Sequence, residues 1–311
     1  MRRYRVVFFG TPEFAIPPLE GLFERENLLA VVTQPEKPKG RGLKFSASPI
    51  KIWAQNKGLP VLEPEKLKDE NFIAKLKEFC PELIVVCAYG KILPKLILEL
   101  PQYGCWNIHA SLLPKYRGAS PINWAILNGE KETGITIFLM EEGLDTGPIL
   151  LQKELPISEE DTALDLSCKL SQLAKEAILE AIELHKKGQL KAFPQGEEGI
   201  SYAPLLKKED GFFTFEEPAL VIERKVRALL PWPTAYTYYK NKLLKVFSAK
   251  AFPLKKGEKP GIILKIMREG VLVSTSQGAI LIKEVQMEGK RRISGYEFAC
   301  GQRLKVGALW E

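Results

Sequence analysis

Short apolar runs alternate with amphipathic stretches over residues 1–189. The runs at 6–9 and 83–88 are continuously apolar, which is typical of parallel strands covered on both faces of a sheet. Between the runs, apolar residues recur every three or four positions, which indicates helices. We therefore predict an α/β fold with a doubly wound, mostly parallel sheet of Rossmann-like form. The predicted strands are 5–9, 29–33, 59–62, 83–88, 105–109, 134–139 and 149–155, and the predicted helices are 14–25, 48–56, 66–79, 94–100 and a long one capped by Ser158.

The pattern changes after residue 189. Residues 190–208 are rich in Pro and Gly, which is typical of a linker. Tightly spaced strands with intervening turns then predict a small antiparallel β-barrel, OB-like in form. The predicted division is an α/β domain at 1–189, a linker at 190–208 and a barrel domain at 209–311. The barrel's predicted elements are a helix at 218–230 and strands at 235–239, 243–247, 261–267, 270–275 and 279–285.

Positive charge is concentrated in the last third of the chain. Residues 206–311 hold 20 Lys and Arg against 11 Asp and Glu, a net charge of +9. Residues 1–205 hold 25 against 27, a net charge of −2. A separately basic domain indicates a polyanionic partner such as nucleic acid, although solubility alone is an alternative explanation.

The composition also excludes several classes of protein. The five cysteines are scattered without a CxxC pair, which argues against a disulfide framework or a thiolate zinc site and favours a reducing cytoplasm. No apolar run reaches the roughly 20 residues of a membrane span, and no signal-peptide pattern is present. The turn after the first strand lacks the GxGxxG fingerprint of a dinucleotide site. We therefore expect a cytoplasmic protein without a bound metal.

The candidate chemistry lies where the fifth predicted strand ends. Asn107 and His109 are two residues apart there, so their side chains project from the same face. A carboxamide beside an imidazole can stabilise the negative charge that develops in acyl transfer. Asp145, in a Gly-Leu-Asp-Thr-Gly turn, is expected to meet His109 because strand ends converge at the carboxyl edge of such a sheet. These residues favour transfer of an acyl group to an amine.

Other interpretations of these residues stay open. Asp145 can bond only its own turn, and a histidine near a strand end can be a satisfied interior residue. Ser111 would complete a Ser-His-Asp hydrolase, but no GxSxG motif surrounds it. A metal site would have only Cys105 beside His109. The chain's other histidine, His185, falls in the last turn of the long predicted helix and is interpreted as structural.

Several segments together resemble a known family. NIHASLLP at 107–114, followed by KYRGA, and the GLDTG turn at 143–147 resemble the formyltransferases that use 10-formyltetrahydrofolate. The segments FFGTPEFA, VVTQPEKPKGRGLK, VCAYGKILP and LPWPTAY extend the resemblance nearly end to end, and bring it closest to the members that formylate methionyl-tRNA. The resemblance implies that Asn107, His109 and Asp145 are the catalytic residues.

The resemblance also implies a cosubstrate, 10-formyltetrahydrofolate, and no metal. The residues implied to contact this folate follow the fourth and fifth predicted strands or lie in the turn that carries Asp145. They are Ala88, Tyr89, Gly90, Ile92, Leu93, Ser111, Leu112, Leu113, Pro114, Met140, Glu142 and Gly143.

A basic loop at 34–49 bears on the identity of the acceptor. It is interrupted by Pro and Gly and carries Lys37, Lys39, Arg41 and Lys44. An ordinary charged surface loop has the same composition. The resemblance implies instead that the loop engages the acceptor arm of a tRNA, and Arg41 is the position we assign. Within this loop, Leu43 departs from the basic pattern expected of the family. Lys207 and Lys208, at the end of the predicted linker, are expected to follow the RNA backbone.

The resulting prediction is a monomeric enzyme that acts on charged initiator tRNA. It would transfer the formyl group of 10-formyltetrahydrofolate to the α-amino group of methionyl-initiator-tRNA, giving N-formylmethionyl-tRNA and tetrahydrofolate for translation initiation. A formyltransferase for a small amine, such as an amino-sugar nucleotide or glycinamide ribonucleotide, would need neither the basic domain nor the loop. A non-catalytic RNA-binding protein would not need an intact set of Asn107, His109 and Asp145.

Overall fold

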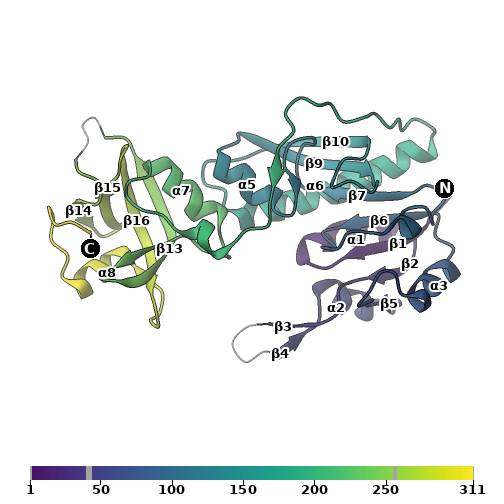
Figure 1. Cartoon of the computed structure of the whole chain (residues 1–311), viewed down its shortest axis with the longest axis horizontal. Helices are drawn as coiled ribbons and strands as arrows, with labels where there is room; N and C mark the ends of the chain where they lie inside the picture. The colour runs from purple at the N-terminus through teal and green to yellow at the C-terminus, as the bar shows by residue number, and fades with distance from the viewer. Residues whose placement is uncertain (1, 40–43, 255–257, 311) are drawn as a thin grey trace. The chain divides into compact units, whose positions relative to one another are not determined.

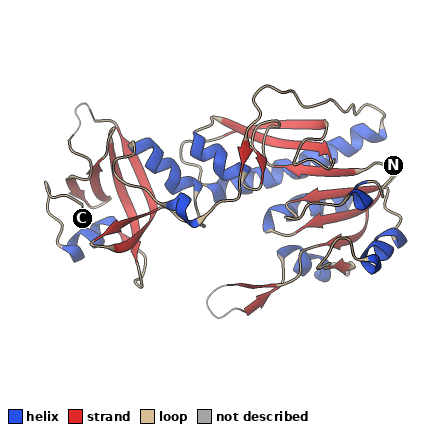
Figure 2. Ribbon diagram, in the orientation of Figure 1, coloured by secondary structure: helices blue, strands red, loops and turns tan. Residues whose placement is uncertain are grey.

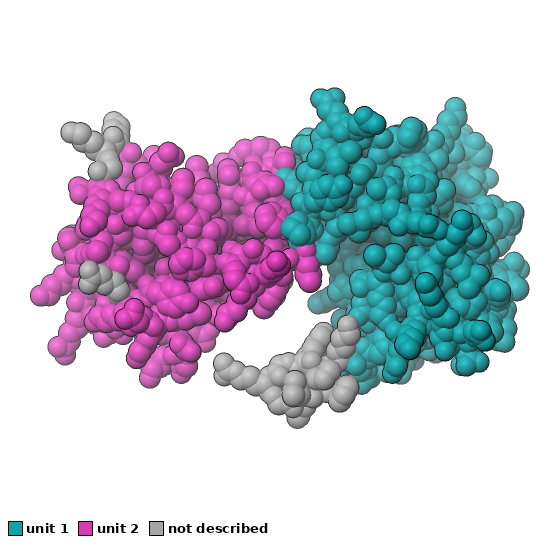
Figure 3. Space-filling view, viewed as in Figure 1, with its two compact units in different colours: residues 1–121, 132–156, 167–204 teal, residues 122–131, 157–166, 205–311 magenta. Residues whose placement is uncertain are grey.

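The computed structural model describes residues 2–39, 44–254 and 258–310. The chain divides into two compact units (Figure 3). Unit 1 comprises residues 1–121, 132–156 and 167–204, and unit 2 comprises residues 122–131, 157–166 and 205–311. The predicted domain limits at 189 and 209 stay predictions. Within the described ranges, no helix combines the length and apolar character needed to cross a membrane.

Unit 1 is built on a seven-stranded sheet in the order β10-β9-β7-β6-β1-β2-β5 (Figures 1 and 2). The five strands from β7 to β5 run parallel, whereas the β7–β9 and β9–β10 pairs are antiparallel. This mostly parallel sheet confirms the predicted fold class. The strands are β1 (Arg5–Gly10), β2 (Asn27–Val32), β5 (Val61–Leu62), β6 (Leu83–Cys87), β7 (Cys105–His109), β9 (Glu132–Leu139) and β10 (Ile149–Pro156).

Amphipathic helices cover the apolar sheet of unit 1. The helix α3 (Glu70–Glu78) places Phe72 and Leu76 in the same apolar cluster as Val7 and Phe9 of β1. Full burial of one such side chain stabilises the fold by about 1.5–3 kcal/mol. The other helices are α1 (Ile16–Arg25), α2 (Pro49–Asn56), α4 (Lys95–Leu98) and most of α6 (Ala163–Lys186), with the 3-10 turn η1 (Glu13–Ala15) before α1.

The helix α6 begins later than the sequence pattern predicts. Ser158 is not its cap, because the Asp161 side chain bonds the Ser158 amide in a separate turn. At the helix start, the Asp165 carboxylate accepts from the Thr162 amide, and the Thr162 hydroxyl accepts from the Asp165 amide. Both pairs have the spacing of a capping box, so spacing alone could not choose between them.

The last turn of α6 is tied to the start of β1. His185 Nδ1 and the Tyr4 hydroxyl share a hydrogen bond of 2.9 Å, and the imidazole ring lies against Tyr103 and Trp106. Burial lowers the pKa of His185 from its ordinary value of 6.5. These contacts agree with the structural role predicted for this histidine.

Unit 2 contains a six-stranded antiparallel sheet in the order β12-β13-β16-β15-β14, with β17 paired to β16. The helices α7 (Ala219–Ala228) and α8 (Gly295–Gln302) contribute Ile222 and Phe298 to its apolar core. Most of α5 (Pro121–Asn128) also belongs to this unit. The strands are β12 (Tyr236–Tyr239), β13 (Lys242–Phe252), β14 (Ile263–Met267), β15 (Gly270–Ser274), β16 (Ala279–Met287) and β17 (Ile293–Ser294).

Candidate active site

Strand β7 carries Asn107 and His109 on one face of the sheet. On the neighbouring strand β9, Phe138 lies opposite Asn107 and Thr136 lies opposite His109. His109 is buried, with 6% of its surface exposed, whereas Asn107 is partly exposed. Among the described residues, the Asn107 carboxamide has no hydrogen-bond partner. The Asn107 amide is therefore available to a bound molecule.

Both ring nitrogens of His109 face an oxygen. Nε2 lies 2.9 Å from the carbonyl oxygen of Tyr116, and because a carbonyl can only accept, Nε2 carries a hydrogen and donates it. Nδ1 lies 3.7 Å from Oδ2 of Asp145. Nδ1 is thus the nitrogen left to exchange a proton or to donate to a substrate, beside a carboxylate that attracts positive charge on the ring.

Asp145 adopts a strained backbone conformation. Its φ of +52° lies in the left-handed region, which residues other than glycine seldom occupy. Its Oδ2 accepts a hydrogen bond of 2.8 Å from the Gly118 amide, so the carboxylate bonds a distant loop and not only its own turn. Gly118 has a φ of +119°, and a Cβ there would lie 2.8 Å from the carbonyl oxygen of Ala203. A glycine at 118 therefore allows this loop to pack against the backbone at Ala203.

The path that brings Asp145 to His109 differs from the predicted one. Because β9 runs antiparallel to β7, its last residue, Leu139, lies opposite the second residue of β7. The carboxyl ends of these two strands do not meet, so the predicted route is wrong. The connection 140–148 between β9 and β10 instead carries Asp145 back to His109. Gly147 allows this return, since a Cβ there would lie 1.8 Å from the Leu139 carbonyl oxygen.

Ser111 is not placed as a nucleophile. It is fully buried, and its hydroxyl donates to the Lys115 carbonyl at 2.6 Å and not to His109. The geometry therefore argues against the Ser-His-Asp hydrolase that the sequence left open.

Thr136 and Gln152 hold the loop after β7, and neither residue was predicted from the sequence. The Thr136 hydroxyl donates to the Ser111 carbonyl at 2.6 Å and accepts from the Leu113 amide at 3.1 Å. Gln152 Nε2 donates to the Leu113 carbonyl at 2.8 Å and to Thr136 Oγ1 at 3.0 Å. A polar residue on each of two predicted strands was the only signal in the sequence, and such residues are common on half-exposed strands.

The first of the segments predicted to contact folate follows β6. Tyr89 packs against Phe9 with ring centres 5.2 Å apart, and its carbonyl accepts from Gln34 at 2.7 Å and from Thr11 at 3.2 Å. Burial raises the pKa of Tyr89 to about 12. The Tyr89 hydroxyl is buried without a hydrogen-bond partner in the described part of the chain.

The other predicted folate residues differ in exposure. Ala88 and Gly90 have φ values of +49° and +79° and are exposed, and Ile92 is 80% exposed. Glu142 and Gly143 are also exposed. The remaining residues are buried or partly buried: Leu93, Ser111, Leu112, Leu113, Pro114 and Met140.

The predicted RNA-binding residues are described only in part. Arg41, with Leu43, lies outside the described residues. The backbone on either side forms an antiparallel pair, β3 (Lys37–Lys39) with β4 (Lys44–Ser46), which contains Lys37, Lys39 and Lys44. Lys207 and Lys208 are exposed where the 3-10 turn η2 (Lys208–Gly211) begins.

Known proteins share both parts of this chain. The family described as "Formyl transferase" matches residues 4–182, and "Formyl transferase, C-terminal domain" matches residues 205–303. The methionyl-tRNA formyltransferase of Thermodesulfovibrio yellowstonii is 50% identical over 303 residues, which cover 97% of each chain. The chain belongs to the methionyl-tRNA formyltransferase family. A second methionyl-tRNA formyltransferase, from Caldanaerobacter subterraneus, is 48% identical over 98% of this chain and 99% of its own.

More distant proteins of known structure share the fold of this chain. The N-formyltransferase of Helicobacter canadensis, in complex with folinic acid and dTDP-3-aminofucose, superposes with a TM-score of 0.67 at 19% identity and covers 91% of this chain and 99% of its own. HypX from Aquifex aeolicus, in complex with tetrahydrofolic acid, gives a TM-score of 0.67 at 20% identity over 98% of this chain and 48% of its own. At such identities the comparison shows the fold alone.

The described residues of this methionyl-tRNA formyltransferase family member show no metal-binding cluster. Those residues contain no group of three or more His, Cys, Asp or Glu side chains that could hold a metal ion. Cys105, which the sequence placed beside His109, instead directs its thiol to the carbonyls of Ile97 and Leu98. Burial raises the pKa of this thiol, so it stays protonated and is a poor metal ligand.

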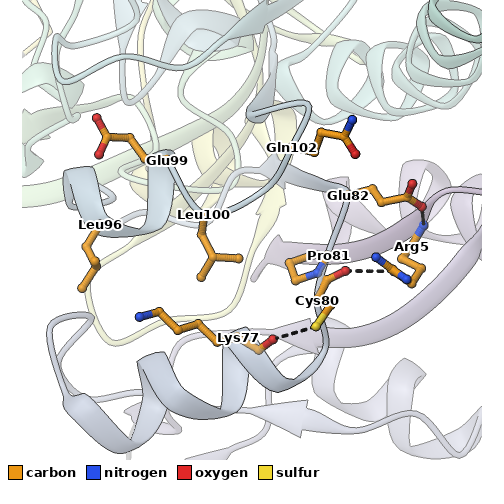
Figure 4. A pocket seen from close by; sticks show the side chains of 9 residues that line it. All are labelled: Arg5, Lys77, Cys80, Pro81, Glu82, Leu96, Glu99, Leu100 and Gln102. Carbon is orange, nitrogen blue, oxygen red and sulfur yellow. Dashed lines mark hydrogen bonds between the residues drawn. The ribbon is translucent and has the colours of Figure 1, made fainter.

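A cavity of about 550 Å³ lies at the other end of the parallel strands (Figure 4). Arg5 begins β1 and Glu82 directly precedes β6, so both lie at the amino ends of strands, whereas His109 ends β7. None of the predicted site residues lines this cavity. Its lining residues are Arg5, Lys77, Cys80, Pro81, Glu82, Leu96, Glu99, Leu100 and Gln102.

Proposed function

We propose that this protein transfers the formyl group of 10-formyltetrahydrofolate to the α-amino group of methionyl-initiator-tRNA. The products are N-formylmethionyl-tRNA, used in translation initiation, and tetrahydrofolate. The observation that carries the proposal is the approach of His109 Nδ1 to Asp145 Oδ2, 3.7 Å apart, on the strand face that also bears Asn107. The 50% identity to a curated methionyl-tRNA formyltransferase supports the same donor and acceptor.

Asn107 and His109 are proposed to stabilise the negative charge on the formyl oxygen while the amine attacks. Asn107 donates from its amide nitrogen. His109 donates from Nδ1 of the protonated ring, because Nε2 already donates to Tyr116. A donor placed where charge develops lowers the barrier by roughly 3–4 kcal/mol.

Asp145 is proposed to stabilise the positive charge on His109 and to accept a proton from the amine. Its carboxylate stabilises the protonated ring of His109 and accepts the proton that the amine loses. The amine must be neutral to attack, and α-amines titrate near pH of about 7.7–8.0. We therefore expect kcat/KM to rise with pH through neutrality in a steady-state profile, whereas a flat profile would contradict amine attack as the limiting step.

The predicted folate residues fit the cosubstrate in chemistry. When bound, 10-formyltetrahydrofolate supplies the formyl group that is transferred. The unpartnered Tyr89 hydroxyl, the exposed backbone at Ala88 and Gly90 and the exposed Ile92 side chain provide polar groups and apolar surface for a heterocyclic ligand. We propose that these residues bind folate together with Leu93, Ser111, Leu112, Leu113, Pro114, Met140, Glu142 and Gly143.

The basic groups are proposed to bind the tRNA. Residues 206–311 carry a net charge of +9, and phosphate contacts supply most of the affinity of a protein for nucleic acid. Arg41 is proposed to engage the acceptor arm, with residues 1–189 as the catalytic domain and 209–311 as the tRNA-binding domain. The other proposed contacts are Lys37, Lys39, Lys44, Lys207 and Lys208. We further propose that the enzyme acts as a monomer in the cytoplasm.

A transfer assay tests the function. The protein is incubated with 10-formyltetrahydrofolate labelled in its formyl group and, separately, with methionyl-initiator-tRNA, dTDP-3-aminofucose or glycinamide ribonucleotide. We expect label on the charged tRNA alone. Label on a nucleotide acceptor and none on tRNA would overturn the proposed acceptor, and no label on any acceptor would overturn formyl transfer.

A further inference from the structure

Gln195 occupies an unusual place in the segment between the two matched family regions, which cover residues 4–182 and 205–303. Every residue from 191 to 200 is exposed except Gln195, which is partly buried. Its Oε1 accepts from Arg117 Nε at 3.1 Å and from Arg117 Nη2 at 2.7 Å. Its Nε2 donates to the carbonyl oxygens of Asp145 and Gly147, each at 2.8 Å. The carboxamide thus uses all its acceptor and donor capacity.

The Asp145 carboxylate makes a second connection between its own loop and the loop that contains Arg117. The Gly118 amide donates to Asp145 Oδ2, and Gly118 directly follows Arg117. Gln195 therefore links the Asp145 backbone to Arg117, and the neighbouring Gly118 amide bonds the Asp145 side chain. Since Asp145 adopts a left-handed φ of +52°, its conformation depends on such external contacts.

Backbone pairings on both sides fix the position of Gln195. On one side, Phe193 exchanges backbone hydrogen bonds of 2.8 and 3.0 Å with Ile149 of β10. On the other side, Ser201 accepts from the Tyr116 and Arg117 amides, each at 2.9 Å. The short strand β11 (Tyr202–Ala203) then pairs with β8 (Arg117–Gly118). The segment around Gln195 is therefore attached to the frame of unit 1 and can resist movement of the Asp145 loop.

We propose that Gln195 is a positioning residue for formyl transfer, which sets the distance between Asp145 and His109 by holding the Asp145 and Gly147 carbonyls. This inference rests on the proposed function, since it assumes that Asp145 acts on His109. Gln195 does not touch substrate in this proposal. Its effect should therefore fall on kcat and leave the KM values of both substrates unchanged.

The first test compares two Gln→Met variants of the full chain. Gln195→Met keeps the length of the side chain and removes its hydrogen bonds, and a displacement of about 1 Å at a reacting group can cost up to about 100-fold in rate. We expect kcat to fall about 10-fold or more, with the KM values within about twofold of the wild type. Gln189→Met, at an exposed position, is the matched control and should leave kcat unchanged. An unchanged kcat in Gln195→Met would overturn the proposal.

A double-mutant cycle separates positioning from a general structural role. In an Asp145→Asn background, the Asp145 carboxylate no longer acts, so Gln195→Met should lower kcat by less than about twofold. The same 10-fold loss in both backgrounds would show that Gln195 acts through another group and would overturn the proposal. If Asp145→Asn alone keeps the wild-type kcat, the catalytic assignment of Asp145 fails, which is a separate outcome.

Gln195→Glu distinguishes the two sides of the carboxamide. A carboxylate still accepts from the buried Arg117 guanidinium, so this variant keeps the Arg117 side folded, but it cannot donate to the Asp145 and Gly147 carbonyls. We expect its kcat to be as low as that of Gln195→Met. A wild-type kcat in Gln195→Glu would show that the hydrogen bonds to Arg117 alone explain the effect of Gln195. It would overturn the proposal that Gln195 positions Asp145.

Discussion

The proposed roles of the two units depend on different properties of their side chains. In unit 1, buried or partly buried polar side chains near the candidate site bond the backbone of a separate segment, as Thr136 bonds the loop after β7 and Gln195 bonds the Asp145 loop. In unit 2, the buried Glu223 carboxylate likewise accepts from the Ala251 amide of a separate segment, but the proposed role of this unit rests on its charge. The charge of this second region is biased, with 20 basic against 11 acidic residues over 206–311.

This difference separates two kinds of dependence on structure. Alignment of one imidazole with one carboxylate depends on the placement of single atoms, so a single substitution in unit 1 should change the rate by a large factor. Attraction of a polyanion depends on the sum of many charges, so a single substitution in unit 2 should change binding by a small, graded amount. Substitutions in each unit test this difference.

Asn107→Ala should give the largest effect. It removes one of the two proposed oxyanion donors, so we expect kcat to fall about 100-fold or more. The thermal midpoint should stay close to that of the wild type, because the Asn107 side chain has no hydrogen-bond partner among the described residues. Steady-state kinetics and a thermal melt check both parts. A kcat within twofold of the wild type would contradict the large effect expected of a single substitution in unit 1.

Thr136→Val should give the next largest effect. Thr136 is fully buried, and valine keeps its shape while leaving the Ser111 carbonyl and the Leu113 amide without this partner. We expect a loss of about 1–3 kcal/mol in the free energy of unfolding and a fall of about 10-fold in kcat as the loop after β7 loosens. Denaturant unfolding and steady-state kinetics measure the two quantities.

The matched control for Thr136→Val is Thr237→Val in β12 of unit 2. Thr237 is also buried, at 5% exposure, but its side chain makes no hydrogen bond with the described residues. We expect its kcat to equal that of the wild type. If both variants lose the same fraction of kcat, the loss reflects general destabilisation and not the loop after β7.

The parts of the fold that were predictable from sequence are those with local causes. Residues 105–109 were predicted as a strand and form β7, because apolar residues dominate the run and a turn precedes it. The direction of β9 was not predictable, since the chain passes through the helix α5 between β7 and β9, and strands joined through a helix are usually parallel. The start of α8 was marked by Ser294 and Glu297, which form its capping box, but the helix was not predicted.

Gln195 shows why the supporting contacts of a site are hard to predict. Pro194, Gly196 and Gly199 around it are typical of a linker, and that composition is a local property. The position of Gln195 is set by pairings with Ile149 and with β8, which are distant in sequence. Asn107, His109 and Asp145 could be named in advance because their chemistry and their resemblance to a family are visible in the sequence, but the contacts that hold them are not.

Lysine substitutions should show the graded dependence. We expect the double variant Lys207→Gln/Lys208→Gln to raise the KM for charged tRNA a few-fold while kcat and the folate KM stay unchanged. Each lost phosphate contact should also reduce the slope of log affinity against log salt by about 0.7–0.9. Lys187→Gln, an exposed position in unit 1, is the control and should keep the wild-type slope. Equal slopes in the double variant and the wild type would show that these lysines contact no phosphate.

His185→Gln should give the smallest effect, and only on stability. Because burial lowers the pKa of His185 from 6.5, the unfolded chain binds this proton more readily than the folded chain. The His185 contribution to stability is therefore fully present above pH 6.5 and is lost as the pH falls through the folded-state pKa. Glutamine does not titrate, so the stability difference between wild type and variant should shrink from pH 7.5 to pH 5 in urea unfolding. A constant difference across this range would mean that the proton on His185 does not couple to folding, and kcat at pH 7.5 should be the same in both proteins.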